Sequence, residues 1–349
     1  MRHRHIGKRD ITMDPIFIVG TERSGSNLLR LILDTHPNIS IPHPPHIMHE
    51  IAPLEERYGD LTQDKNFRSL IDAAVRIVEL HFAPWDIDID RERIFKEAVD
   101  RNAYCIKRAI YEQFMRAKGK KRWGCKSTFM IHYTDVVRKY HEVPKFIHLI
   151  RDGRDVAVSA RDSVFNHFHP HYVSLLWRDQ QKLAMRLSVE LPKEQFITVY
   201  YEALVFNPEK EVRKICDFIG EDYVGEMLKY ASRPDSAALA GVSKSWENLS
   251  KPILANNTKK YQHKLTRDEI FAVERNAFKE LSHFGYVLEN DLNKLRQAST
   301  ALGFRKKIKY YLSEKSRMIS VGLSSMFSDK NAYLRLRKRF FVWSLRATL

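Results

Sequence analysis

The sequence has few cysteines: Cys105, Cys125 and Cys216 are the three among its 349 residues. Three thiols cannot form a disulfide framework, and none has the paired spacing of a zinc site. We therefore expect a protein of a reducing, cytoplasmic compartment. No apolar run approaches the roughly 20 residues that a membrane-spanning helix needs. The basic residues 1–9 are not followed by the apolar stretch of a signal peptide.

Acidic residues are scarce near the end of the chain. Residues 303–349 carry 12 Lys or Arg against 2 Asp or Glu, a net charge of +10, which leaves +6 for the preceding 302 residues. Such a tail is typical of a solvated extension or of a segment that contacts an anionic surface. Nucleic acid is not expected as a partner, because the sequence has no recognition-helix, RNP or zinc-finger pattern.

Hydrophobic residues make up 44% of the chain and charged residues 29%, as in globular proteins. Apolar runs predict strands at 15–19, 122–125, 145–150 and 195–200. Helices are predicted from 26 to about 35 and at 67–80, 93–116, 173–191, 209–219 and 267–281, whereas 38–53 and 241–261 look irregular. Strands that alternate with helices predict a parallel α/β sheet. We expect one domain over 12–290 and a basic, helical extension over 291–349.

The segment GTERSGSN, which begins at Gly20, lies between an apolar strand and an amphipathic helix. Glycines allow close backbone approach, and the free N–H groups of a helix N-terminus favour anions. Gly20 and Gly25 fit the phosphate-loop pattern GxxxxGK[ST], but Ser26 and Asn27 replace its lysine and its magnesium-binding hydroxyl. The loop is therefore predicted to hold a phosphate without ATP-type metal chemistry, with Arg23 as the cationic side chain.

A second candidate anion site follows the strand at 145–150. Ligands of open α/β sheets bind beyond the carboxyl ends of the strands, where Arg151 can grip a phosphate with two N–H bonds. Ser159 is expected one turn into the next helix, on a face that looks back toward Arg151. By itself the motif RDGR is also compatible with a polar turn in which Asp155 caps the helix.

Together, FIVGTERSGSNLLRLILDTHP and KFIHLIRDGRDVAVSA resemble the 5′-phosphosulfate loop and the 3′-phosphate segment of sulfotransferases that use 3′-phosphoadenosine-5′-phosphosulfate (PAPS). The bacterial and Golgi-type branches are the more similar ones. WGCK, YYEALV and the pair GVS and KP resemble later landmarks, the last pair in protein-tyrosine sulfotransferases. The resemblance covers residues 15–288 and implies a P-loop-like parallel sheet and transfer of a sulfuryl group from PAPS to an acceptor hydroxyl.

The resemblance also implies roles for individual residues in binding PAPS. The 5′-phosphosulfate is assigned to the first loop, the 3′-phosphate to the second, and the remaining contacts to residues that face or cover the nucleotide. In that order they are Arg23, Ser24, Gly25, Ser26 and Asn27; Arg151 and Ser159; and Tyr201, Ser243 and Lys251. Glu22 departs from the family, which usually has proline there, so its carboxylate must point away or pair with a base.

Catalysis is expected to rest on positioning and electrostatics, without a metal. Arg23 and Lys126 are the candidates for stabilising the charge that develops on the bridging oxygen. The general base is assigned to His43, because its loop carries the catalytic glutamate in related proteins. His46 and Glu50 remain alternatives.

Two other interpretations compete with sulfuryl transfer. A P-loop nucleotide kinase would explain the first loop but not the missing lysine, and a non-enzymatic polyanion-binding protein would explain the tail but not two anion loops. The acceptor stays open: a sugar, a lipid, a small molecule or a peptide tyrosine.

The tail raises a question of its own. If residues 333–343 are helical, Tyr333, Leu336, Phe340 and Trp343 share one face beside a basic cluster. This face predicts either peripheral docking on an anionic membrane or packing onto the catalytic domain or across a homodimer.

Overall fold

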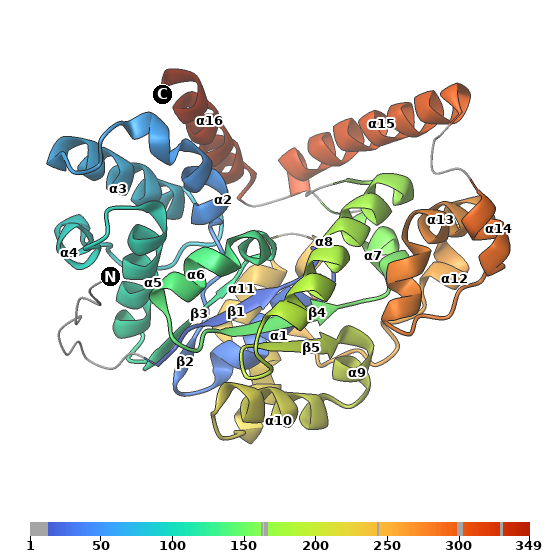
Figure 1. The fold of residues 1–349 in the computed structure, drawn as a ribbon, viewed down its shortest axis with the longest axis horizontal. Helices are drawn as coiled ribbons and strands as arrows, with labels where there is room; N and C mark the ends of the chain where they lie inside the picture. Colours follow the sequence, from blue (N-terminus) through green and yellow to red (C-terminus); the bar gives the residue numbers. More distant parts are fainter. Residues whose placement is uncertain (1–12, 162, 164–166, 243, 299–302, 329–330) are drawn as a thin grey trace.

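Five parallel strands form the centre of the molecule (Figure 1). The computed structural model describes residues 13–161, 163, 167–242, 244–298, 303–328 and 331–349. Within them the strand order is β2-β3-β1-β4-β5, and each neighbouring pair is parallel. The strands are β1 (Ile16–Val19), β2 (Ile39–Ser40), β3 (Arg122–Lys126), β4 (Lys145–Ile150) and β5 (Phe196–Tyr200). The predicted parallel α/β class is confirmed.

The two faces of the sheet bury alternate residues of the central strand β1, as the period of two requires. Phe17 and Val19 belong to one apolar core and Ile16 and Ile18 to the other. The first face is covered by α2 (Ile47–Ile51), α3 (Asp64–Glu79), α4 (Arg91–Glu97), α5 (Ala103–Ala117), α6 (Thr134–Tyr140) and part of α8 (Pro170–Glu190). The second is covered by α1 (Ser26–Thr35), α9 (Tyr201–Phe206), α10 (Pro208–Ile219), η3 (Gly225–Ser232), α11 (Pro234–Ala240) and η4 (Lys244–Ser250).

A third apolar cluster surrounds Ile150 at the end of β4. It joins α7 (Gly153–Ala160), α8 and α13 (Arg267–His283), with α12 (Tyr261–Lys264) and α14 (Leu292–Gln297) at its edge. Because Val19 pairs with His148 in the parallel register, the loops that follow β1 and β4 leave the same edge of the sheet. This register places the two predicted anion loops side by side.

Several predicted boundaries are wrong for local reasons. Residues 38–53 contain β2 and α2 as well as loop, and η1 (Ala52–Tyr58) follows. The predicted helix 93–116 is two helices, because Asn102 caps a new one by accepting from the Cys105 N–H. Helix α7 starts at Gly153, with Asp152 as its N-cap, so Asp155 lies in the first turn instead of capping it.

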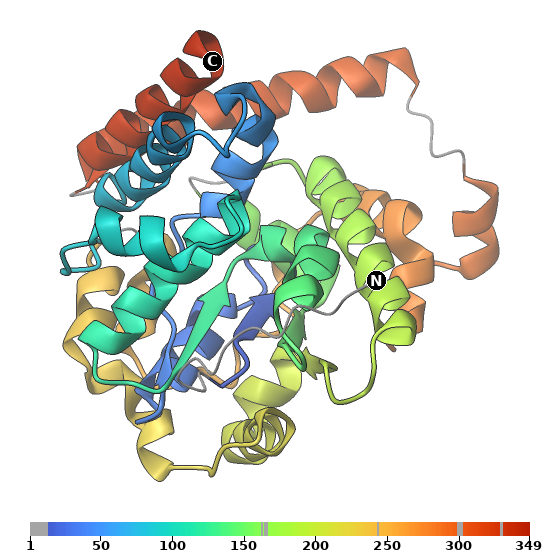
Figure 2. The same ribbon diagram turned by 60° about the vertical axis from the view of Figure 1, so that its left-hand side comes forward.

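Two helices end the chain, α15 (Phe304–Ser328) and α16 (Ala332–Thr348). In both ribbon views they lie on the same side of the sheet domain (Figures 1 and 2), and Arg346 of α16 pairs with Glu50 of α2. Helix α16 packs on the first core through the buried Val342 and the partly buried Phe341 and Leu345. None of the helices in the described residues is long and apolar enough to cross a membrane.

Candidate functional site

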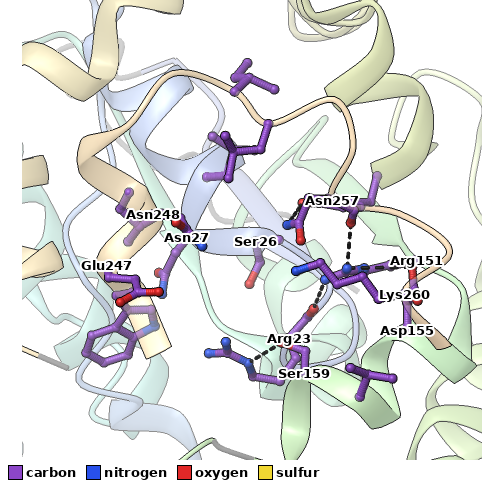
Figure 3. Close-up of a pocket in the computed structure, with 18 of the residues that line it drawn as sticks. Arg23, Ser26, Asn27, Arg151, Asp155, Ser159, Glu247, Asn248, Asn257 and Lys260 are labelled. Carbon is purple, nitrogen blue, oxygen red and sulfur yellow. Dashed lines mark hydrogen bonds and ion pairs between the residues drawn. The ribbon is translucent and has the colours of Figure 1, made fainter. Parts of the chain in front are cut away.

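A cavity of about 590 Å³ opens where the loops after β1 and β4 meet (Figure 3). Its lining comes from the first loop and α1, from Arg151 and α7, and from the segment 246–264. The two predicted anion loops therefore face one space, although about 130 residues separate them in the sequence. This position beyond the carboxyl ends of parallel strands is the usual ligand position of open α/β sheets.

The first loop requires its two glycines. Gly20 has φ 139°, and a Cβ there would lie 2.3 Å from the Leu149 carbonyl oxygen. Gly25 has φ 90°, and a Cβ there would lie 2.4 Å from the ring of Tyr201. Arg23 also adopts a left-handed conformation, with φ 69°, which a non-glycine residue rarely does outside functional or strained turns. The loop is thus held in one shape by close contacts to two other segments.

The N-terminus of α1 points its first backbone N–H groups into this loop. Ser26 and Asn27 are its first two residues, and both line the cavity. Amides at such a position have no intrahelical acceptor, and the helix dipole adds positive potential. The buried Ser24 hydroxyl and Asn27 Oδ1 have no hydrogen-bond partner among the residues described. The backbone N–H groups of the helix end and the Ser24 hydroxyl together can bind an anion.

Arg151 links the two loops. Its Nη1 donates to the Arg23 carbonyl oxygen at 3.3 Å, and its Nη2 donates to the Asn257 carbonyl oxygen at 2.8 Å. Its guanidinium lies over the Tyr201 ring, and its buried Nε has no acceptor within the part of the chain that the structure describes. Arg23 in turn donates from Nε to the Ser159 hydroxyl at 3.1 Å. These contacts hold two arginines at the cavity wall.

The second arginine of the RDGR motif has a different role. Arg154 is fully buried and forms ion pairs of 2.7 Å with both Asp152 and Glu274. Its guanidinium also lies over the Tyr261 ring, 4.1 Å from the centroid. Arg154 therefore fastens α7 to α13 and is not among the residues that line the cavity.

Cationic side chains outnumber acidic ones around the cavity. The lining includes Asp155 and Glu247 as its acids, and Arg23, Arg151, Arg161, Lys260, Lys264 and Arg317 as its cations. Asp155 is engaged within the protein, because its carboxylate accepts from the Tyr261 N–H and lies 3.7 Å from Arg151. Burial raises the pKa of Asp155. The excess of positive charge favours a polyanionic ligand.

A cluster of buried histidines lies next to the cavity. Nδ1 of His43 and Nε2 of His81 are 2.8 Å apart, so one of the two nitrogens donates to the other. The His43 ring centroid is 5.3 Å from that of Trp246, and Trp246 lines the cavity. Burial, followed by the neighbouring His81 and Lys126, holds the pKa of His43 well below its usual value, so His43 is neutral at pH 7.

Lys126 ends β3 beside this cluster. Burial lowers its pKa to about 8, and the carboxylate of Glu22 opposes that shift. At pH 7 the ammonium therefore keeps most of its charge. The acidic residue that departs from the family pattern thus lies where it interacts with a base.

The two alternatives for the general base are held in other contacts. Nδ1 of His46 lies 2.9 Å from the Ser127 hydroxyl, and burial is the main cause of a pKa well below the usual value. Glu50 forms an ion pair of 3.1 Å with Arg346 of α16. Neither residue lines the cavity, and His43 is likewise absent from its lining.

The structure brings most of the predicted binding residues together. Those that line the cavity are Arg23, Gly25, Ser26, Asn27, Arg151, Ser159 and Tyr201. Ser24, His43 and Lys126 are buried and are not among the lining residues. Lys251 is exposed and absent from the lining, and its ammonium donates to Asn248 Oδ1 at 3.0 Å. Ser243 lies outside the described residues.

Sequence reasoning missed four residues of this region. Asn257 contacts both Arg151 and the Tyr201 hydroxyl, to which its Nδ2 donates at 2.5 Å. Trp246 and Lys260 line the cavity, and His81 pairs with His43. The irregular composition of 241–261 was a signal for a loop over the ligand, but it did not indicate which side chains turn inward. His81 had no signal, because it follows a helix of ordinary amphipathic pattern.

Comparison with known proteins agrees with this geometry. The family described as "Sulfotransferase family" matches residues 15–224. Protein-tyrosine sulfotransferase 2 of Gallus gallus is 20% identical over 250 residues, covering 69% of this chain and 61% of the relative. The protein-tyrosine sulfotransferase of Drosophila melanogaster is 22% identical over 251 residues, covering 69% and 45%. The chain thus spans about half to three fifths of the length of these relatives.

Solved structures show the same fold. The sulfotransferase domain from the Synechococcus PCC 7002 olefin synthase aligns with a TM-score of 0.55 at 21% identity, covering 80% of this chain and 98% of that one. The sulfotransferase domain from the curacin biosynthetic pathway aligns with a TM-score of 0.53 at 16% identity, covering 79% and 99%. At these identities the likeness concerns the fold.

Proposed function

The chain belongs to the sulfotransferase family, and we propose that it transfers the sulfuryl group of PAPS to a hydroxyl group of its acceptor. The observation that carries this proposal is the pair of anion loops that meet at one cationic cavity. A donor with a 5′-phosphosulfate and a separate 3′-phosphate needs two such sites. ATP has no phosphate for the second one.

The residues present fit this donor. The N–H groups at the α1 N-terminus and the Ser24 hydroxyl offer donors for the phosphosulfate, and the buried Ser24 hydroxyl has no partner in the described chain. Arg151 and Ser159 offer donors for the 3′-phosphate, with Arg151 Nε still to be satisfied. Tyr201 presents its ring to the same space and holds Arg151 in place. Ser243 and Lys251 keep their proposed covering role as a hypothesis.

In the proposed reaction, the acceptor oxygen forms a bond to sulfur while the bond between sulfur and the 5′-phosphate oxygen breaks. Negative charge then builds on the leaving phosphate oxygen, where Arg23 and Lys126 stabilise it. The hydroxyl proton passes to His43, which is neutral at pH 7 and has Nε2 without a partner in the described residues. Burial is the main cause of the lowered pKa of His43, and a bound anion offsets only the smaller contribution of neighbouring groups such as Lys126.

The names of the curated relatives make a tyrosine hydroxyl one candidate acceptor, beside a sugar, a lipid or a small molecule. The decisive experiment supplies purified protein with PAPS labelled at sulfur and with one acceptor from each class. We expect the label to move to one class. If the protein binds neither PAPS nor 3′-phosphoadenosine-5′-phosphate (PAP), the proposal is wrong. Calorimetry with PAP and with ATP measures donor selectivity independently of the acceptor.

A further inference from the structure

The exposed apolar side chains of this protein are concentrated on its last two helices. Of the 21 large hydrophobic residues that are exposed in the described residues, 13 belong to α15 and α16. They are Phe304, Ile308, Tyr311, Leu312, Met318, Ile319, Leu323, Met326 and Phe327 on α15, and Tyr333, Leu336, Phe340 and Trp343 on α16. Such a concentration of exposed apolar side chains on two helices indicates an interaction surface.

Helix α15 contacts the sheet domain through its polar side. Glu314 accepts from the backbone N–H groups of Phe168 and His169, and Arg317 donates to the Arg161 carbonyl oxygen. The ring of Tyr310 lies 4.2 Å from that of His169. At 100° per residue, most of the exposed apolar residues fall on the opposite side of the helix. We call this side the outer face of α15.

One face of α16 packs against the sheet domain, and its residues have their contacts there. Val342 is buried in the first core, Lys338 donates to the Pro45 carbonyl oxygen at 2.6 Å, and Arg346 pairs with Glu50. The outer face of α16, formed by Tyr333, Leu336, Phe340 and Trp343, is a separate stripe with 47–68% of each residue exposed. Packing onto the catalytic domain was one prediction for these aromatic residues. In the structure they are exposed instead.

The charged residues that border these outer faces indicate what kind of surface binds there. On α16 the exposed Arg337 and Arg339 lie on either side of the stripe, and on α15 Lys307 and Lys309 flank it in the same way. An apolar stripe bordered by Lys and Arg is typical of helices that lie in the interface of anionic bilayers. The core of a protein dimer interface is instead depleted of charge. The net charge of +10 over residues 303–349 agrees with the former.

We propose that the outer faces of α15 and α16 form one docking surface for anionic membranes. Both helices lie on the same side of the molecule in Figures 1 and 2. Arg317 of α15 also lines the cavity, and α16 is bonded to Pro45 through Lys338 and to Glu50 of α2 through Arg346. Because Arg317 lies on the domain side of α15, docking would hold the cavity one helix diameter, roughly 10 Å, from the bilayer surface.

The test is co-sedimentation of the full chain with vesicles of phosphatidylcholine alone or mixed with phosphatidylglycerol. We expect binding to the mixed vesicles at low salt and its loss at about 1 M salt, where the Debye length is about 3 Å. The triple variant Leu336→Ser, Phe340→Ser and Trp343→Ser should lose binding. The matched triple variant Val189→Ser, Phe206→Ser and Val287→Ser, at exposed positions outside α15 and α16, should retain it.

A second variant tests the charges without touching the apolar stripe. Arg337→Gln with Arg339→Gln should weaken binding to the mixed vesicles by about fivefold for each charge removed. If the serine variant does not fold, this double arginine variant still tests the proposal. Equal binding to neutral vesicles, or no binding of the full chain at low salt, overturns the proposal. So does a dimer that the serine variant converts to monomer without any vesicle binding. PAP affinity, measured in parallel, reports on the active site alone.

Discussion

The guanidinium of Arg151 lies over the ring of Tyr201, with 4.4 Å between its central carbon and the ring centroid. The same ring closes the space above Gly25 in the first loop. One tyrosine of α9 therefore fixes both the loop assigned to the 5′-phosphosulfate and the arginine assigned to the 3′-phosphate. Their relative position is set before any ligand binds.

Replacing Arg151 with alanine should weaken PAP binding by about 1.5–3 kcal/mol, as for a lost charged hydrogen bond. Calorimetry measures the change. Arg213→Ala is the matched control, since Arg213 pairs with Glu209 on α10, away from the cavity. An unchanged affinity for PAP would assign the 3′-phosphate to another residue. Equal affinity of the native protein for ATP and PAP would contradict the proposed selectivity.

Sulfuryl transfer should not depend on a metal ion, because Ser26 and Asn27 occupy the positions of the lysine and the magnesium-binding hydroxyl in P-loop enzymes. Turnover should therefore be the same before and after dialysis against EDTA. If activity disappears in EDTA and returns with magnesium, the reaction depends on a metal ion, and the prediction from the loop sequence is wrong.

His43→Ala should lower turnover by roughly 100-fold while PAP binding stays intact, as expected for a lost general base. The exposed His263→Ala serves as the control. Near-normal turnover of the His43 variant would move the role to His46 or Glu50. A parallel loss of PAP binding would indicate that His43 supports the fold of the cavity wall instead.

The buried histidines should make the protein less stable in mild acid. Burial holds the pKa values of His43, His46 and His81 well below 6.5 in the folded state. As the pH falls below about 6.5, the unfolded chain takes up protons that the folded chain refuses, so the free energy of unfolding decreases. Each group contributes up to about 1.4 kcal/mol per pH unit.

Urea unfolding between about pH 7 and pH 5 measures this slope. His81→Gln should reduce the slope, and the exposed His263→Gln should leave it unchanged. A slope that is the same in the native protein and in the His81 variant would show that this histidine does not contribute.

Replacing the buried Lys107 with an uncharged residue should increase the stability of the folded protein. Its ammonium is fully buried between aromatic rings, 4.1 Å from the centroid of Trp123 and 4.4 Å from that of Tyr111, and burial lowers its pKa to about 8. Lys107→Met keeps the length and removes a buried charge, so it should raise the free energy of unfolding at pH 7 by roughly 1–3 kcal/mol. Lys139→Met on the surface is the control, and a destabilised Lys107 variant would show that the aromatic contacts outweigh desolvation.

The sequence by itself determined four of the five strands in the described residues, the parallel class and the two anion loops, and the family predicted from those loops is confirmed. These features depend on local requirements: apolar runs for buried strands, and glycines at 20 and 25 where φ is positive. The tertiary structure decided which side chains meet. Arg151 and Arg154 are three residues apart in one motif, yet one faces the cavity and the other the core. His43 pairs with His81, 38 residues away, and the outer face of α16 is exposed because Lys338 and Val342 anchor the opposite side. Such partners come from distant segments, and local patterns carry no information about them.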